Sequence, residues 1–364
     1  MKTKTCEFVF NCSLLVGSCS FLPMFIVDAH LDLSYNAERG RDVRRPASQQ
    51  PIIGDEIASV GLPDLKAGGV GLICATIFCL PATASVAGDP RGYHDAEGAR
   101  ARALSQLDWY RRCIADGQLR FVKSLPPGST ELTEVGAESS EPVSAILLME
   151  GADALRSPAD VSAWFEAGMR IVGLAWKRTR YAGGTGEPGP LTGDGVALVR
   201  ELDRFGIIHD TSHLAEESFW QLLDSTEGPV IASHSNCRWI VPTDRQLSDE
   251  MIRALIKRKG VIGINFFDKF LLTPNDYGRR RANLADVTTH IRHMCDLAGD
   301  ALHVGLGTDM DGGLGRDQIP EEIRTSADLP RVADALSTGG FNDAEIEAVL
   351  GKNWMRFFTS NLPR

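Results

Sequence analysis

Short apolar runs rich in β-branched residues recur along the chain, and longer segments that mix apolar and charged positions separate most of them. The apolar runs span residues 25–27, 69–78, 143–149, 171–175, 207–208, 230–231, 260–265 and 302–307. Runs of this kind predict buried strands, whereas residues 91–115 and 158–167 have the pattern of helices. Strands that alternate with helices form parallel sheets. Eight of them predict an α/β fold, a (β/α)8 TIM barrel.

Two of the predicted strands lie close together in the sequence, within residues 206–235, and flank a helical segment at 215–223. The first leads to Ser212–His213 and the second to Ser233–His234. Parallel strands end on the same side of a sheet, which in a barrel is the side where catalysis takes place. A single histidine after a strand is more often a packing residue. Two at equivalent strand ends favour a shared ligand in one pocket.

The same position after other predicted strands carries more side chains of the metal-binding types. They are His30 and Asp32 after the first strand, Glu150 after the third and Asp309 after the eighth. Imidazoles combined with carboxylates suit zinc or another borderline divalent ion. Six such residues exceed one tetrahedral site but fit two metals that share a bridging carboxylate. Each has an ordinary explanation alone, as a strand-end turn or a helix-capping loop. Together they favour a binuclear metal site at the C-terminal mouth of the barrel.

Composition restricts the classes of function. The net charge of −10 and the lack of a basic stripe argue against a nucleic-acid partner. Hydrophobic residues make up 43% of the chain and charged residues 24%, as in ordinary globular proteins. The eight cysteines are scattered, and their spacing fits neither a disulfide framework nor a zinc ribbon. These features leave a small-molecule partner as the expectation.

Residues 1–23 have an ambiguous pattern. Lys2 and Lys4 precede a mixed apolar run, as in a secretory leader, but polar residues interrupt that run. It is too short and polar for a membrane-spanning helix. Because a strand pattern starts directly after Met24, we favour a misassigned start, one domain over residues 24–364 and a cytoplasmic location. Export is the alternative if residues 1–23 act as a signal peptide. The last residues given, 361–364, do not form an apolar tail, so we expect no lipid anchor.

Five short motifs carry the candidate ligands. They are Asp28-Ala29-His30-Leu31-Asp32, Met149-Glu150-Gly151, Asp210-Thr211-Ser212-His213, Ser233-His234-Ser235 and Gly305-Leu306-Gly307-Thr308-Asp309-Met310-Asp311-Gly312. Together they resemble the membrane (renal) dipeptidase family, zinc peptidases of the amidohydrolase superfamily. The resemblance runs from about Val27 to the turn at 351–353 and covers nearly the whole predicted barrel.

The resemblance implies a metallopeptidase with two Zn2+ ions per chain. It assigns His30 and Asp32 to one ion, assigns His213 and His234 to the other, and makes Glu150 the bridging ligand. Glu150 would therefore belong to the catalytic machinery as well as to the metal site.

The resemblance also implies residues that act on the substrate. Asp309 would be the acid/base that handles the proton of the bridging water. Arg245 falls where the family has an arginine that binds the substrate carboxylate, for which a guanidinium fork is suited. Trp176 replaces a histidine that stabilises the tetrahedral intermediate in the family's dipeptidases. Losing such a donor typically lowers turnover by roughly 10²–10³-fold. The basic residues at 177, 178 and 180 could substitute for it.

Three functions then compete. The expected one is a zinc-dependent dipeptidase that hydrolyses short peptides, including dipeptides with a C-terminal D-residue. The second is another metal-dependent amide or lactone hydrolase, or a biosynthetic enzyme on the same scaffold, and Trp176 slightly favours it. The third is a catalytically silent metal-binding or assembly protein, against which the retention of Asp309 counts. A homodimer is compatible with any of the three.

Overall fold

The strands of the computed structural model, which describes residues 25–84, 91–126 and 141–363, form a parallel barrel. Their order around it is β7-β6-β5-β4-β2-β1-β9-β8. Their bounds are β1 (Ile26–Leu31), β2 (Val70–Phe78), β4 (Val143–Glu150), β5 (Met169–Gly173), β6 (Ile208–Asp210), β7 (Val230–Ile231), β8 (Ile262–Ile264) and β9 (Val304–Leu306). The two ends of this order meet where Ala232 bridges Ile262 in parallel. The predicted (β/α)8 architecture is confirmed.

One strand was not predicted. β3 (Leu119–Phe121) pairs with the first half of β4, at residues 143–145, while β5 pairs with the second half, at residues 147–150. β3 and β5 therefore lie on the same side of β4, with β3 nearer to the N-terminal end of that strand. Its three residues alternate between buried and more exposed, so they lack the apolar run that marked the other strands.

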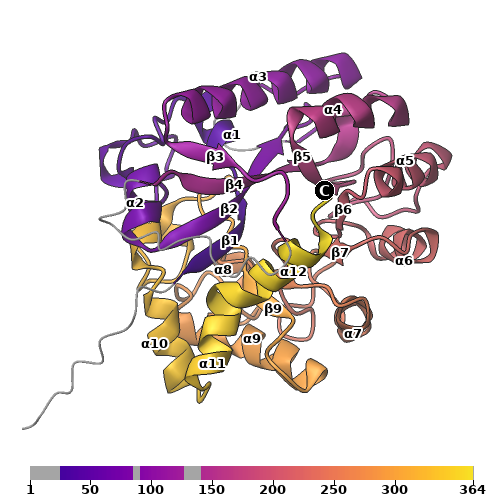
Figure 1. The fold of residues 1–364 in the computed structure, drawn as a ribbon. Coiled ribbons are helices and arrows are strands. Elements are labelled where there is room, and N and C mark those ends of the chain that lie inside the picture. Colours follow the sequence, from indigo (N-terminus) through magenta and orange to yellow (C-terminus); the bar gives the residue numbers. More distant parts are fainter. Residues whose placement is uncertain (1–24, 85–90, 127–140, 364) are drawn as a thin grey trace, which may run out of the picture.

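The helices surround the strands (Figure 1). Those that connect them are α1 (Leu33–Glu38), α2 (Leu62–Ala67), α3 (Ala96–Ala115), α4 (Val161–Ala167), α5 (Gly193–Arg204), α6 (Glu216–Ser225), α7 (Asp249–Lys257), α8 (Asp268–Leu271) and α9 (Leu284–Ala298). After β9 follow α10 (Arg331–Thr338), α11 (Asp343–Glu347) and α12 (Asn353–Asn361). The helix expected from residue 91 begins five residues later, because the Asp95 side chain accepts a hydrogen bond from Gly98 N–H and caps it.

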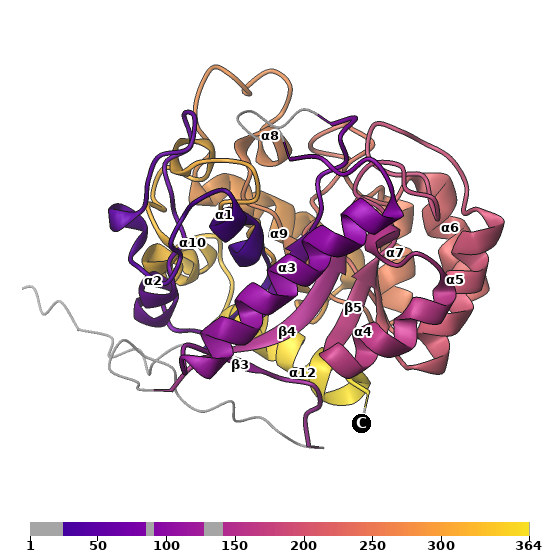
Figure 2. The ribbon, with the colours of Figure 1, turned by 90° about the horizontal axis from the view of Figure 1, so that it is seen from above.

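The C-terminal helix closes one end of the barrel. α12 packs against β1 and β9, and its Trp354 and Phe358 join apolar strand residues such as Leu72 and Ile146 in one buried cluster. The Trp354 indole N–H donates to the carbonyl of Leu306 at 2.9 Å, so its burial leaves no polar atom unpaired. In Figure 2, α12 lies at one end of the barrel and α8 at the other. Since α12 fills its end with side chains, the opposite mouth is left for a site.

Two further expectations concern location. Within the described ranges, the structure has no helix that is both long and apolar enough to cross a membrane. The interpretation of residues 1–23 as a leader or a misassigned start falls outside the described residues. The cysteines that are described are free and buried.

Candidate metal centre

The six candidate ligands converge at the C-terminal ends of the strands, as their positions in the sequence predicted. His30 lies within β1 and Asp32 follows that strand, Glu150 ends β4, and His213, His234 and Asp309 each come three residues after β6, β7 and β9. All six are buried. The backbone of His213 and of Asp309 is left-handed, with φ of 67° and 57°. Such conformations are costly for residues other than glycine and gather at functional sites.

Glu150 lies at the centre of the cluster. Its Oε1 is 3.2 Å from His213 Nε2 and 3.3 Å from His234 Nε2, and its Oε2 is 3.7 Å from His30 Nε2. His30 Nε2 is in turn 3.6 Å from Asp32 Oδ2. The structure therefore has two half-sites that share one carboxylate: His30–Asp32–Glu150 and Glu150–His213–His234.

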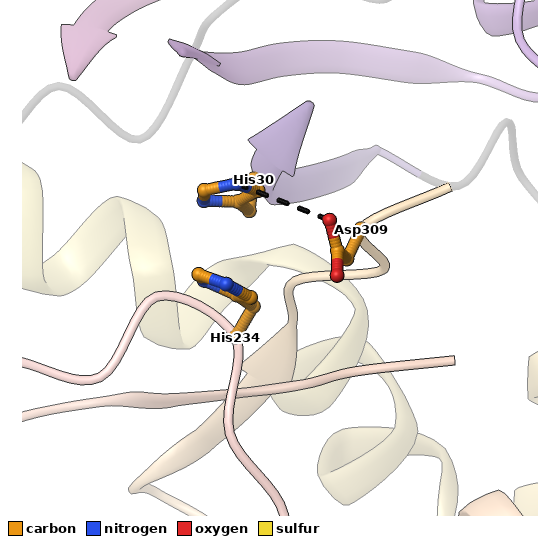
Figure 3. A group of neighbouring side chains, drawn as sticks. All are labelled: His30, His234 and Asp309. Carbon is orange, nitrogen blue, oxygen red and sulfur yellow. Dashed lines mark ion pairs between the residues drawn. The ribbon is translucent and has the colours of Figure 1, made fainter. Parts of the chain in front are cut away.

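A third group links the two half-sites to the remaining acid. Its members are His30, His234 and Asp309, drawn in Figure 3, where the two rings lie one above the other and Asp309 points towards them. The ring centroids are 3.7 Å apart, and His30 Nε2 is 4.0 Å from Asp309 Oδ1. In each of the three groups the possible ligand atoms lie within 4.8 Å of one another.

The residues present fit divalent metal ions. Among the described residues, His30 Nε2, Asp32 Oδ1 and Glu150 Oε1 are buried and have no hydrogen-bond partner. A buried polar atom left unpaired typically costs about 1–3 kcal/mol. Three such atoms pointing into one cluster indicate a missing partner common to all of them. Imidazole nitrogens with carboxylate oxygens are the donors preferred by zinc and similar ions.

The charges of the cluster lead to the same conclusion. Burial raises the pKa of Glu150 well above its usual value, and it raises that of Asp309 to about 7. Burial opposes the charged form of His30, but Glu150, Asp32 and Asp309 outweigh it and raise the pKa of this histidine to about 10. Burial, and then nearby cations, hold the pKa of His213 and His234 well below its usual range. Buried acids that repel one another favour a cation between them.

Neighbouring side chains orient the cluster, and sequence reasoning missed them. Asn265 Nδ2 donates to Asp309 Oδ2 at 2.9 Å, and Thr185 Oγ1 lies 3.0 Å from His213 Nδ1. Asn265 ends the seventh predicted strand, so the rule that found the ligands could have found it too. Thr185 lies in the glycine-rich loop after β5, where nothing in the sequence marks it.

Arg245 lies beside the cluster but behind its histidines. Its guanidinium donates to the His234 carbonyl at 2.6 Å and to Ser235 Oγ at 3.0 Å, and it lies 5.2 Å from the ring centroid of Phe270. The side chain is buried. It therefore sits near the site, as expected, against the ring of Phe270, which lines the neighbouring cavity.

A cavity of about 220 Å3 opens above the ligands. The side chains of its apolar wall are Tyr35, Phe78, Trp176, Phe267, Phe270 and Leu314. Trp176 lines the cavity, with its ring 5.2 Å from that of Phe78 and 6.1 Å from that of His213. Lys177 also lines it, and its ammonium lies 3.7 Å from Glu187.

Of the three basic residues that could replace the missing histidine, two point elsewhere. Arg178 donates to the Pro188 carbonyl. Arg180 pairs with Asp153 at 3.3 Å. Lys177 is therefore the member of this basic segment that faces the cavity.

Comparison with known proteins agrees with this geometry. The model of the family "Membrane dipeptidase (Peptidase family M19)" matches residues 22–361. An uncharacterised protein from the pqqA 5′ region of Klebsiella pneumoniae is 31% identical over 208 residues, which are 54% of this chain and 74% of that protein. An uncharacterised dipeptidase of Schizosaccharomyces pombe is 28% identical over 269 residues, which are 70% of this chain and 61% of that protein.

Two solved structures share the fold over nearly the whole chain. The dipeptidase AC, a metallopeptidase of family M19, is 26% identical with a TM-score of 0.75, covering 94% of this chain and 99% of that one. A metallopeptidase from Rhodobacter sphaeroides, liganded with a phosphinate mimic of the dipeptide L-Ala-D-Ala, has the same identity and TM-score, with 93% and 99% covered. With its fold, its ligand cluster and its family match in agreement, the chain belongs to the membrane dipeptidase family, peptidase family M19, and is a metal-dependent hydrolase.

Proposed function

We propose that this protein is a zinc-dependent dipeptidase that hydrolyses the peptide bond of short peptides, including dipeptides with a C-terminal D-residue. The observation that carries the proposal is the pair of half-sites sharing Glu150 at the base of a small cavity. A related metallopeptidase binds a mimic of L-Ala-D-Ala, which supports the D-residue. A cavity of about 220 Å3 lies below the usual range for drug-sized ligands, so it suits a small substrate.

The chain's own residues have distinct tasks in this proposal. His30, Asp32 and Glu150 would hold one zinc ion, and Glu150, His213 and His234 the other. Bound ions supply Lewis-acid polarisation of the scissile carbonyl and a lower pKa for the attacking water. Glu150 fixes the spacing of the two half-sites, because each of its oxygens faces a different one.

Asp309 is the proton carrier of the proposed reaction. It lines the cavity next to His30, and Asn265 holds its Oδ2 from behind. Oδ1 is thus directed towards the cluster, where it can accept a proton from the attacking water. The same oxygen then delivers that proton to the amine nitrogen as the peptide bond breaks. A positioned acid/base of this kind contributes about 10²–10⁴-fold to a rate.

Arg245 is proposed to bind the substrate carboxylate. Its buried Nε has no hydrogen-bond partner among the described residues, so the guanidinium retains donor capacity. Arg245→Ala is expected to lower kcat/KM for dipeptides by roughly thirty- to a thousand-fold, the worth of one or two charge-assisted hydrogen bonds. A dipeptide amide should be a poor substrate whose cleavage barely changes in the variant. Since Arg245 also supports the His234 carbonyl, the zinc content of the variant must be measured alongside.

The test of the proposal is a substrate screen on zinc-loaded protein. Elemental analysis should find close to two zinc ions per chain, and L,L, L,D and D,D dipeptides should then be assayed for amino-acid release. Cleavage of dipeptides that stops on chelation and returns with zinc would support the assignment. Protein that holds two zinc ions but cleaves no dipeptide would overturn it.

A second function is favoured by Trp176. An indole in the cavity wall offers one neutral N–H where the family's dipeptidases are expected to have an imidazole. Hydrolysis of a different amide or of a lactone needs the same metal centre with another oxyanion donor. The same screen, extended to N-acyl amino acids and lactones, separates the two functions. The cytoplasmic location and a homodimer are further proposals, for cell fractionation and light scattering to test.

A further inference from the structure

The hydroxyl of Ser233 lies between two ligand histidines that belong to different half-sites. Its Oγ is 2.7 Å from His234 Nδ1, 3.4 Å from His30 Nδ1 and 2.5 Å from Asp210 Oδ2. Ser233 is fully buried. We propose that Ser233 is a positioning residue that fixes both imidazoles at once, while its own hydroxyl donates a hydrogen bond to Asp210. The inference rests on the two-metal centre proposed above.

The hydrogen-bonding capacity of the group determines its directions. A hydroxyl has one proton and two acceptor sites, and an ionised carboxylate only accepts. The Ser233 proton must therefore point to Asp210, which leaves both lone pairs for the histidines. Each histidine then donates from Nδ1, the His234 bond being the stronger and the 3.4 Å bond to His30 the weaker. Both Nε2 atoms consequently face the cluster, and each can bind metal there once it has lost its proton.

Asp210 is itself held rigidly. Its Oδ1 accepts hydrogen bonds from Ser212 N–H at 3.0 Å and from Ser233 N–H at 2.8 Å. Three donors thus fix the carboxylate at the end of β6, next to the end of β7. The orientation of the Ser233 hydroxyl is fixed in turn, because it donates a short hydrogen bond to this immobile carboxylate.

Because Ser233 contacts one histidine of each half-site, its loss should affect the binding of both zinc ions. His30 belongs to the half-site with Asp32, and His234 to the half-site with His213. Loss of the Ser233 hydroxyl should therefore weaken both zinc-binding steps. Partners behind ligating histidines typically change metal affinity by about 10–100-fold when mutated. Thr185, in contrast, lies against the Nδ1 of His213 alone and should affect one step.

The experiment compares the two zinc dissociation constants, measured by competition with a chelator, in the holoenzyme's variants. Ser233→Ala should weaken both constants by about 10–100-fold, and Ser233→Thr, which keeps the hydroxyl, should restore them to near wild type. Thr226→Val is the matched control. Thr226 is also buried and donates to a carboxylate, Asp203 at 2.6 Å, next to a histidine that is outside the cluster. It should lower thermal stability and leave both constants unchanged.

A second measurement needs no variant to fold. In zinc-loaded wild-type protein, nitrogen–proton NMR correlations should show a proton on Nδ1 and none on Nε2 for His30 and His234. A proton on Nε2 of either ring would overturn the inference, and so would unchanged zinc constants in Ser233→Ala or a loss confined to one step. Wild-type protein that binds no zinc at all would instead refute the proposed function, so the two failures can be told apart.

Discussion

Replacing Glu150 with glutamine tests the metal centre most directly, because this carboxylate belongs to both half-sites. Glutamine keeps the shape of the side chain but removes its charge. It also turns one oxygen, which faces either His30 or the pair His213 and His234, into an NH2 group that cannot bind a cation. We expect the folded structure to persist and zinc binding to fail.

The size of the effect follows from the spacing of the cluster. Its ligand atoms lie within 4.8 Å of one another. Two unit charges about 4 Å apart interact by about 4 kcal/mol at an effective dielectric constant of about 20. Because a zinc ion carries two charges, loss of the Glu150 charge should weaken the binding of each ion by at least about 4 kcal/mol, roughly a thousand-fold or more.

Thermal denaturation with and without zinc measures this loss. Zinc at about 100 times its dissociation constant stabilises the wild-type protein by about 2.7 kcal/mol for each ion bound, whereas the same concentration should leave Glu150→Gln unchanged. Glu56→Gln is the matched control, since Glu56 is buried and accepts two hydrogen bonds from Arg39, at 2.7 and 2.9 Å. It should lower the melting temperature of the metal-free protein but preserve the rise with zinc. Wild-type zinc affinity in Glu150→Gln would refute the shared-ligand reasoning.

The remaining predictions concern the reaction and the response to pH. Asp309→Asn should keep both zinc ions and lower kcat by about 10²–10⁴-fold; elemental analysis with steady-state kinetics checks this, and full turnover would exclude Asp309 as the proton carrier. Trp176→His should raise kcat for dipeptides, by up to roughly 10²-fold, and no gain on any cleaved dipeptide would count against the missing-donor explanation. Burial raises the pKa of Asp268 to about 6, whereas the unfolded chain ionises this group at about pH 4. The folded state therefore loses stability progressively as the pH rises from about 4 to about 6, and the loss is complete above that pH. Asp268→Asn should therefore gain on wild type by about 1–3 kcal/mol as the pH rises from 4 to 7, as measured by chemical denaturation, and a constant difference would contradict it.

The fold followed from local pattern because a barrel strand must be apolar along its length. Strands buried by helices on one face and by the barrel interior on the other appear as continuous apolar runs. The run at residues 69–78 gave β2 almost residue for residue. β3 was not predicted because it covers only three residues, whose exposure alternates and which therefore form no apolar run.

The ligands could be predicted for a related reason. Connections that cross back through a helix make successive strands parallel, so every residue that follows a strand lies at the same mouth of the barrel. The positions of His30, Glu150 and His234 in the sequence therefore already imply that they meet. Their chemical types then indicate a divalent metal, before any distance is known.

What surrounds those ligands was decided by the tertiary structure alone. Ser233 lies beside His30 although 203 positions separate them, and Asn265 meets Asp309 across 44. The same is true of Arg245, whose number places it near His234 but whose orientation against the Phe270 ring depends on how the loops pack. The parallel direction of the strands determines at which end of the barrel a residue that follows a strand lies. Hydrogen-bond partners depend on distances of about 3 Å between loops, and these are set by packing across the whole barrel mouth, which no local pattern encodes.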